Sequence, residues 1–232
     1  EVLVAALPLG GDGSGDAAGG GDGDDAPELD PEALAAKRAE RNARARNPKF
    51  KFANFPALRG ADDYAKGVVM QKKQLKEGML QWQAVEIPRS LTELAADDSK
   101  LAVHVHKSLL GYMGEKQMSF PAMLAQDVLQ KGLAREALRD ELYCQLMKQL
   151  SSNPKADSIA KGWQVMCMCV STFPPSDDLR DYLVNFLLAQ AEKRGAVRNY
   201  AKYCSRALDG ILESGASGFV PATDEIEAYA KR

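Results

Sequence analysis

The residues whose chemistry could bind a metal ion occur as two closely spaced pairs, His104 with His106 and Cys167 with Cys169. Two helical residues that are two positions apart point about 200° away from each other, so neither pair can hold one metal ion. None of the four cysteines belongs to a C-x-x-C motif, and all lie in apolar stretches. We therefore expect no metal site and reduced, buried thiols, with a structural disulfide as the open alternative.

The candidates for catalysis are also incomplete. Asp140 and Glu141 are adjacent, so on a helix they diverge and cannot face one substrate as an acid and base pair. The glycine-rich stretch at residues 10–23 does not end in Lys or Ser/Thr, and its carboxylates would repel a phosphate. The sequence contains no G-x-S-x-G motif. We therefore predict a binding protein that is not an enzyme and uses no cofactor.

Helices must position any binding surface, because apolar residues recur at helical spacing and no stretch alternates with a period of two. Asp97, Asp98 and Ser99 are expected to cap one of the helices. The expected helices are residues 62–77, 97–113, 120–130 with a stop at Gly132, one from Leu138, 158–172, one capped by Ser176, and 197–214. This order predicts an all-α fold, a compact superhelical bundle of about six or more stacked antiparallel helices.

Two helices between Leu138 and Phe173 are expected to form the centre of the bundle. In the first of them, Glu141, Gln145 and Lys148 lie opposite a broad apolar arc, which is typical of an amphipathic core helix. The second helix is apolar on nearly all sides, as expected of a helix surrounded by others.

Arg139 projects into the apolar arc of the first central helix. A guanidinium cannot lose its charge there, so it needs a carboxylate or several carbonyl groups as partners. Glu136 and Asp140 are the nearest carboxylates.

The runs LRDELYCQLMKQLSSNP (residues 138–154) and GWQVMCMCVSTFPPS (residues 162–176) occur in that order. Together with IPRSL (residues 87–91) and YMGE (residues 112–115), they resemble the signature of the myosin tail homology 4 (MyTH4) domain over roughly residues 62–214. The resemblance implies an all-α fold. It also identifies a family motif, which we expect to be structural: Arg139, Asp140, Glu141, Tyr143, Gln145, Lys148, Gln149, Asn153, Pro154, Gly162 and Trp163.

Charge divides the rest of the chain. Residues 1–31 hold eight acidic and no basic side chains and are expected to be a disordered leader. Residues 32–60 hold eight basic and two acidic side chains and are expected to be a basic arm, tethered by phenylalanines 50, 52 and 55. We assign residues 61–215 to the helical domain and 216–232 to a linker that resembles the approach to a FERM module.

The resemblance implies a non-catalytic tail module of a cytoskeletal motor, with microtubules as its partner. Tubulin is acidic, so basic clusters would bind it electrostatically. The alternative for each cluster is an ordinary solvent-exposed surface that binds no partner. The candidate contacts are Lys72, Lys73, Lys76, Arg198, Lys202, Arg206, Lys37, Arg38, Arg41, Arg44, Arg46, Lys49 and Lys51.

Three other functions stay open. The first is a cargo or regulatory scaffold that acts only together with an adjacent FERM domain. The second is binding to actin or to cargo proteins as further partners. The third is binding to anionic lipid headgroups, although no amphipathic segment with bulky anchors is apparent in the sequence. We expect neither nucleic acid as a partner nor a transmembrane segment.

The parent protein most resembles the kinesin-like calmodulin-binding proteins, and an unconventional myosin is the second choice. The chain begins with Glu1 and not with Met, so we expect it to be part of a longer chain. That parent would be an ATP-driven, coiled-coil, calmodulin-binding motor whose motor domain lies outside this chain. We expect the protein to be cytoplasmic and associated with the cytoskeleton.

Overall fold

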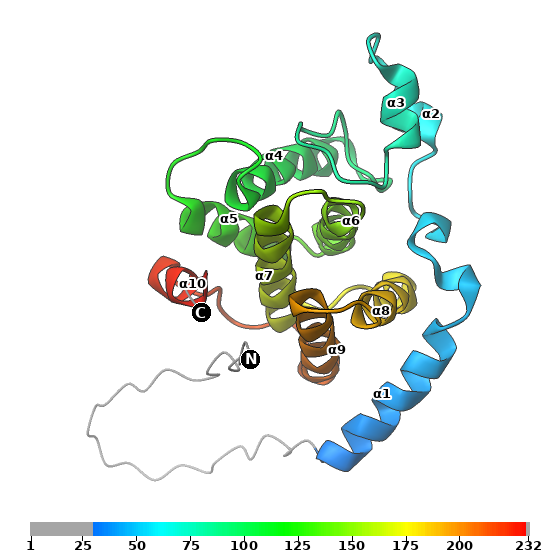
Figure 1. The fold of residues 1–232 in the computed structure, drawn as a ribbon, viewed down its shortest axis with the longest axis vertical. Helices are drawn as coiled ribbons and strands as arrows, with labels where there is room; N and C mark the ends of the chain where they lie inside the picture. Colours follow the sequence, from blue (N-terminus) through cyan, green and yellow to red (C-terminus); the bar gives the residue numbers. More distant parts are fainter. Residues whose placement is uncertain (1–29, 231–232) are drawn as a thin grey trace.

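The computed structural model describes residues 30–230, and within that range the chain forms ten α-helices (Figure 1). The prediction of an all-α fold is therefore confirmed. The prediction of a disordered leader concerns residues that lie almost entirely outside the described range. Leu58 and Thr92 form an isolated antiparallel bridge between two loops.

Helix α7 (Ala156–Thr172) lies at the centre, where it packs against α4, α5, α6 and α9 (Figure 1). Its Trp163 is 1% exposed. The indole stacks on Phe186 and Tyr200, with ring centroids 6.2 Å away in both cases. The apolar helix predicted from the sequence is thus surrounded by others, because only burial on all sides satisfies such a surface.

Five further helices complete the bundle: α4 (Ala96–Met113), α5 (Pro121–Ala134), α6 (Arg139–Leu150), α8 (Asp177–Ala191) and α9 (Ala196–Ser214). Ser176 caps α8 as predicted, because its Oγ accepts a hydrogen bond from Leu179 N. The first turn of α4 has no such cap: its N-cap is Ala95, and none of the predicted carboxylates or Ser99 acts as the cap. Gly114 ends α4 in the left-handed region, with φ of 82°.

Gly132 does not end its helix, contrary to the prediction. Helix α5 continues to Ala134, and the glycine serves close packing instead. A Cβ at this position would lie 2.4 Å from Cζ of Phe173 and 2.8 Å from Cδ1 of Leu142. Gly132 therefore permits the contact of α5 with the start of α6.

The predicted helix at residues 62–77 is also wrong, because it consists of two short helices, α2 (Ala61–Tyr64) and α3 (Lys72–Glu77). Gly67 and Gln71 between them have φ of 84° and 58°, which no continuous helix allows. The two helices form a hairpin that projects from the bundle at the top of Figure 1. We call residues 61–77 the α2–α3 hairpin.

Both ends of the described chain pack on the bundle. Helix α1 (Pro31–Ala45) lies on α8, and two 3-10 turns, Pro48–Phe50 and Phe52–Asn54, follow it. A third, Glu136–Leu138, precedes α6. Helix α10 (Thr223–Ala230) packs on α5 and α7 through the buried Ile226, so the segment expected to be a linker includes a packed helix. In the described range no helix is both long and apolar enough to cross a membrane.

Candidate partner-binding surfaces

The polar residues of the family motif lie inside the domain. Glu141 is fully buried, and its carboxylate accepts hydrogen bonds from Leu91 N at 2.9 Å, Thr92 N at 2.7 Å and Thr92 Oγ1 at 2.6 Å. Gln145 Nε2 donates to the same carboxylate at 2.8 Å and to the Ala102 carbonyl at 3.0 Å. Burial raises the pKa of Glu141, and the four hydrogen bonds oppose that shift. The predicted polar face of α6 thus binds the loop that follows the α2–α3 hairpin.

Lys148 and Gln149 continue this row one turn later. Lys148 is buried, and its ammonium donates to the carbonyls of Gly78 and Gln81 and to the Gln83 side chain. Burial lowers the pKa of Lys148 to about 7. Gln149 pairs with the Gln83 backbone in both directions, at 3.1 and 3.0 Å. The loop between Gly78 and Thr92 is irregular, so its backbone groups need these side chains as partners.

Gln149 also lies 3.2 Å from Nε2 of His106. Burial, together with the nearby ammonium of Lys148, lowers the pKa of His106 to about 3. The imidazole is therefore neutral and accepts the amide hydrogen of Gln149. His104 on the same helix is 60% exposed and points away, as its spacing predicts.

The other motif residues join neighbouring elements. Asp140 accepts from Ser176 N and Oγ at the start of α8, and Tyr143 donates to the Phe173 carbonyl at 2.6 Å. Asn153 accepts from Lys155 N at 2.9 Å in the turn before α7. Each of these contacts lies within the chain.

Arg139 is half-buried, and its Nε donates to the Gly132 carbonyl at 3.1 Å. A second, longer contact of 3.5 Å reaches the Leu133 carbonyl. Carbonyl groups are therefore its partners, and the predicted carboxylates of Glu136 and Asp140 are not.

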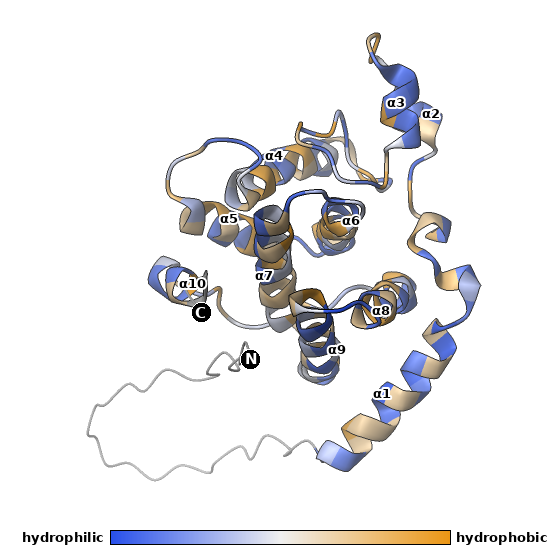
Figure 2. Cartoon of the chain, in the orientation of Figure 1, coloured by the Kyte–Doolittle hydropathy of each residue, from blue (hydrophilic) through white to orange (hydrophobic). Residues whose placement is uncertain are grey.

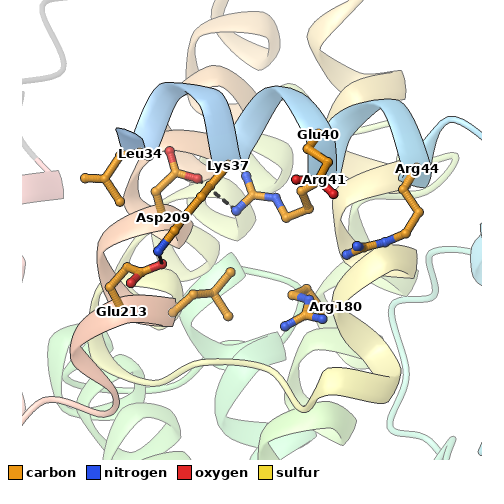
Figure 3. A pocket seen from close by; sticks show the side chains of 9 residues that line it. Leu34, Lys37, Glu40, Arg41, Arg44, Arg180, Asp209 and Glu213 are labelled. Carbon is orange, nitrogen blue, oxygen red and sulfur yellow. Dashed lines mark hydrogen bonds and ion pairs between the residues drawn. The ribbon is translucent and has the colours of Figure 1, made fainter. Parts of the chain in front are cut away.

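The basic arm is a docked helix, and carboxylates of the domain oppose most of its charges (Figure 3). Arg38 and Arg41 hold Asp209 of α9 at 3.0 and 2.8 Å. Asp209 is 7% exposed, and burial raises its pKa while the two guanidiniums oppose the shift. Lys37 pairs with Glu213 at 2.9 Å. The arm is therefore less available to an acidic partner than its sequence predicts.

The end of the arm is held in the same way. Arg44 forms a bidentate pair with Asp181, at 2.7 and 2.9 Å, and Arg46 lies 3.9 Å from Glu192. The Lys49 ammonium lies over the Phe50 ring. In the described range, Lys51 has no ion pair and is exposed. A polar cavity of about 280 Å³ remains under α1, lined by Leu34, Lys37, Glu40, Arg41, Arg44, Arg180, Asp209, Leu212 and Glu213 (Figure 3).

Helix α9 carries a row of exposed basic residues, Arg198, Lys202 and Arg206, which we call the α9 stripe. None of the three is within ion-pair distance of a carboxylate in residues 30–230. Lys193 and Arg194 are also exposed, in the turn between α8 and α9. Both belong to the run KRGAVR, which is the signal in the sequence for further basic residues beside the stripe.

The lysines of α3 are partly neutralised. Lys76 pairs with Asp62, and Lys73 lies 3.9 Å from Glu77. Lys72 is exposed and forms no ion pair with the described residues. The basic residues of α1 lie beside those of α9. Arg46, Lys49 and Lys51 follow the end of α1, and the lysines of α3 lie on the α2–α3 hairpin.

The surface also has two grooves. One, of about 390 Å³, has an apolar floor of Leu187, Leu188 and Ala191 and a polar rim of Arg38, Asn42, Lys202, Ser205 and Arg206. The other, of about 540 Å³, lies between α5, α7 and α10 and is lined by Tyr112, Pro121, Ala122, Asp157, Ala160, Lys161, Gln164, Ile226 and Glu227. Both are open to solvent.

No group of three or more His, Cys, Asp or Glu side chains among residues 30–230 could hold a metal ion. All four cysteines are free thiols and buried, and the Sγ atoms of Cys167 and Cys204 lie 3.5 Å apart.

Comparison with protein families and solved structures gives a consistent result. The MyTH4 domain model matches residues 125–228. The chain is 43% identical over 143 residues to the high molecular weight form of myosin-1 of Acanthamoeba castellanii, covering 62% of this chain and 9% of that protein. It is 31% identical over 173 residues to the kinesin-like protein KIN-14I of Oryza sativa subsp. japonica, covering 70% and 14%. The chain thus spans a small part of these relatives.

Solved structures with the same fold include the MyTH4-FERM MF1 domain of Dictyostelium discoideum myosin VII. The TM-score is 0.65 at 26% identity, over 88% of this chain and 38% of that one. The human myosin 7b C-terminal MyTH4-FERM domain, solved with the harmonin-a PDZ3 domain, gives 0.59 at 27% identity, over 65% and 32%.

Proposed function

Because the chain contains a MyTH4 domain, a non-catalytic module of myosin and kinesin tails, we propose that it binds microtubules through the α9 stripe. In this function the domain tethers or positions a cytoskeletal motor. The observation that carries the proposal is that Arg198, Lys202 and Arg206 are exposed and unopposed in the described range, whereas the arm is largely neutralised.

The stripe has the geometry that an acidic surface requires. Its residues follow one another at i, i+4 and i+8, so their charges lie on one line along the helix. Such a row increases the association rate with an acidic partner and makes affinity depend on salt. The adjoining groove, with its floor of Leu187 and Leu188, provides the packed contacts that would fix orientation.

Cosedimentation of the 232-residue chain with microtubules across a salt series tests the proposal. We expect saturable binding that weakens with salt. The variant R198E/K202E/R206E should lose at least about tenfold in affinity, because three attractive charges become repulsive. A matched control, K49E/K51E, reverses two charges at the end of the arm and should bind nearly as the unchanged chain does.

A second truncation variant lacks residues 1–29, which removes the acidic segment and leaves α1 in place. Binding should survive this truncation. Retained binding by the α9 variant, or its loss in the K49E/K51E control, would contradict the assignment to α9.

A second candidate is a cargo or regulatory scaffold that acts with an adjacent FERM domain. The groove beside α10 and the exposed Phe120 and Met123 at the start of α5 favour it, as does the similarity to MyTH4-FERM structures. The myosin 7b structure contains harmonin-a PDZ3 as a partner of that protein. This candidate predicts that the chain alone binds microtubules weakly at every salt concentration, and that partner binding requires the FERM domain.

The parent remains part of the proposal. Either a kinesin-like calmodulin-binding motor or an unconventional myosin could contain this domain. The sequence identity of the chain to the amoebal myosin-1 is higher than to the plant kinesin-like protein, 43% against 31%. ATP-driven motion, actin binding and calmodulin binding would belong to other parts of that parent.

A further inference from the structure

The tip of the α2–α3 hairpin exposes two large apolar side chains. Val69 is 91% exposed and Met70 is 80% exposed, the two highest values among the exposed large apolar side chains in the described range. Both belong to the loop between α2 and α3. This loop, at the top of Figure 2, is partly coloured hydrophobic, whereas α3 below it is mostly hydrophilic. An adjacent pair of such side chains at a projecting tip contributes little to the core and is available for a contact outside the chain.

Turn conformations and a hydrogen bond bound the tip on both sides. Gly67 and Gln71 adopt left-handed conformations, and Arg89 Nη2 donates to the Lys66 carbonyl at 3.1 Å. Tyr64 at the base is fully buried. The tip is therefore presented by a structured turn anchored to the domain.

Charge is distributed unevenly along the hairpin. Lys66, Lys72 and Lys73 flank the tip and are exposed. The carboxylates lie nearer the base, where Lys76 pairs with Asp62, Lys73 lies 3.9 Å from Glu77, and both Arg59 and Arg89 pair with Asp63. The tip therefore combines apolar side chains at its end with a collar of lysines behind them.

We propose that the tip of the α2–α3 hairpin binds the surface of a bilayer that contains anionic lipids. Val69 and Met70 insert between the headgroups, and Lys66, Lys72 and Lys73 contact the anionic headgroups around them. The tip projects and is basic, so it complements a broad, deformable anionic surface without needing a pocket in a partner. This activity goes beyond the microtubule binding proposed above, because it uses a different surface.

Vesicle flotation of the 232-residue chain tests the proposal. We expect it to float with phosphatidylcholine vesicles that contain phosphatidylserine, and to stay in solution with phosphatidylcholine alone. The V69S/M70S variant should lose at least about tenfold in vesicle affinity through reduced apolar burial. The K66Q/K72Q/K73Q variant should lose about fivefold for each lysine.

The matched control is V85S, because Val85 is also exposed, at 66%, but lies outside the hairpin. It should float as the unchanged chain does. Thermal melts of all variants should coincide, because the altered side chains are exposed.

A fluorescent reporter gives an independent readout. All four native cysteines are buried, so an environment-sensitive dye attaches selectively to the variant Met70→Cys. Its emission should shift to the blue with anionic vesicles only. Failure of the unchanged chain to float, or flotation of V69S/M70S at unchanged affinity, would overturn the proposal. Neither result would affect the test of microtubule binding, because the α9 stripe is unchanged in these variants.

Discussion

Helices α6 and α9 both carry their polar side chains in rows, but the two rows have opposite surroundings. On α6, Glu141, Gln145, Lys148 and Gln149 are fully buried and bind the loop between Gly78 and Thr92 or its neighbours. On α9, the stripe is exposed and has no carboxylate partner in residues 30–230. The difference lies in what covers each row. The α6 row is covered by an irregular loop whose backbone groups need side-chain hydrogen-bond partners, whereas the α9 row faces solvent.

The comparison separates two roles that charged residues have in one domain. Buried polar side chains whose every contact is internal determine the fold, and their loss leaves unsatisfied groups. Exposed charges without partners contribute little to stability and are available for binding. Three changes test this distinction, in order of decreasing expected effect on stability.

The change Glu141→Ala should have the largest effect. It leaves the buried amides of Leu91 and Thr92 without acceptors, so the free energy of unfolding should fall by at least about 3 kcal/mol. Urea denaturation followed by circular dichroism measures it. Glu136→Ala, at an exposed position shortly before α6, is the control and should change stability little; equal effects would contradict the internal role of Glu141.

Acid should weaken the same network through His106. Its pKa is about 3 in the folded state and about 6.5 when unfolded, so the unfolded chain binds the proton more tightly. Stability should therefore fall as pH decreases from about 6.5 toward 3, with a loss from this group of about 2 kcal/mol at pH 5.

The measurement compares urea unfolding at pH 7.5 and pH 5. The variant His106→Gln should lose this part of the pH dependence, whereas His104→Gln should keep it because His104 is largely exposed. If both variants respond to pH alike, the burial of His106 does not control the acid response.

Neutralising the α9 stripe should have the smallest effect on stability. The variant R198Q/K202Q/R206Q removes no ion pair within residues 30–230, so the unfolding free energy should change by less than about 1 kcal/mol. A thermal melt beside microtubule cosedimentation measures stability and binding together. A large loss of stability would place the stripe in the same class as the α6 row.

Most of the fold could be predicted because its signals are local. Ser176 and the prolines at 174 and 175 bound α8 and α7, and the apolar surface of α7 predicts its central position. The break in the predicted helix at residues 62–77 does not follow from periodicity, because Gly67 fits a helical position equally well, whereas its lack of a side chain allows the positive φ that breaks the helix.

The surroundings of charged residues could not be predicted in the same way. Nothing in the spacing of Glu141 or Lys148 indicates that a loop more than 45 residues upstream will cover them. The spacing of Arg41 likewise does not indicate Asp209, which lies far along the chain. Periodicity identifies which side chains share a face, whereas tertiary structure decides whether that face meets solvent, loop or helix.

The contact of α6 with the loop before α4 also sets the limits of the folding unit. The family match begins at residue 125, yet the acceptors of the Lys148 ammonium begin at Gly78 and the donors to Glu141 lie at Leu91 and Thr92. A fragment cut at residue 125 would retain the motif and lose its partners. We expect such a fragment to be open to proteolysis and prone to aggregation, and we expect a stable fragment to need the residues from Gly78 onward.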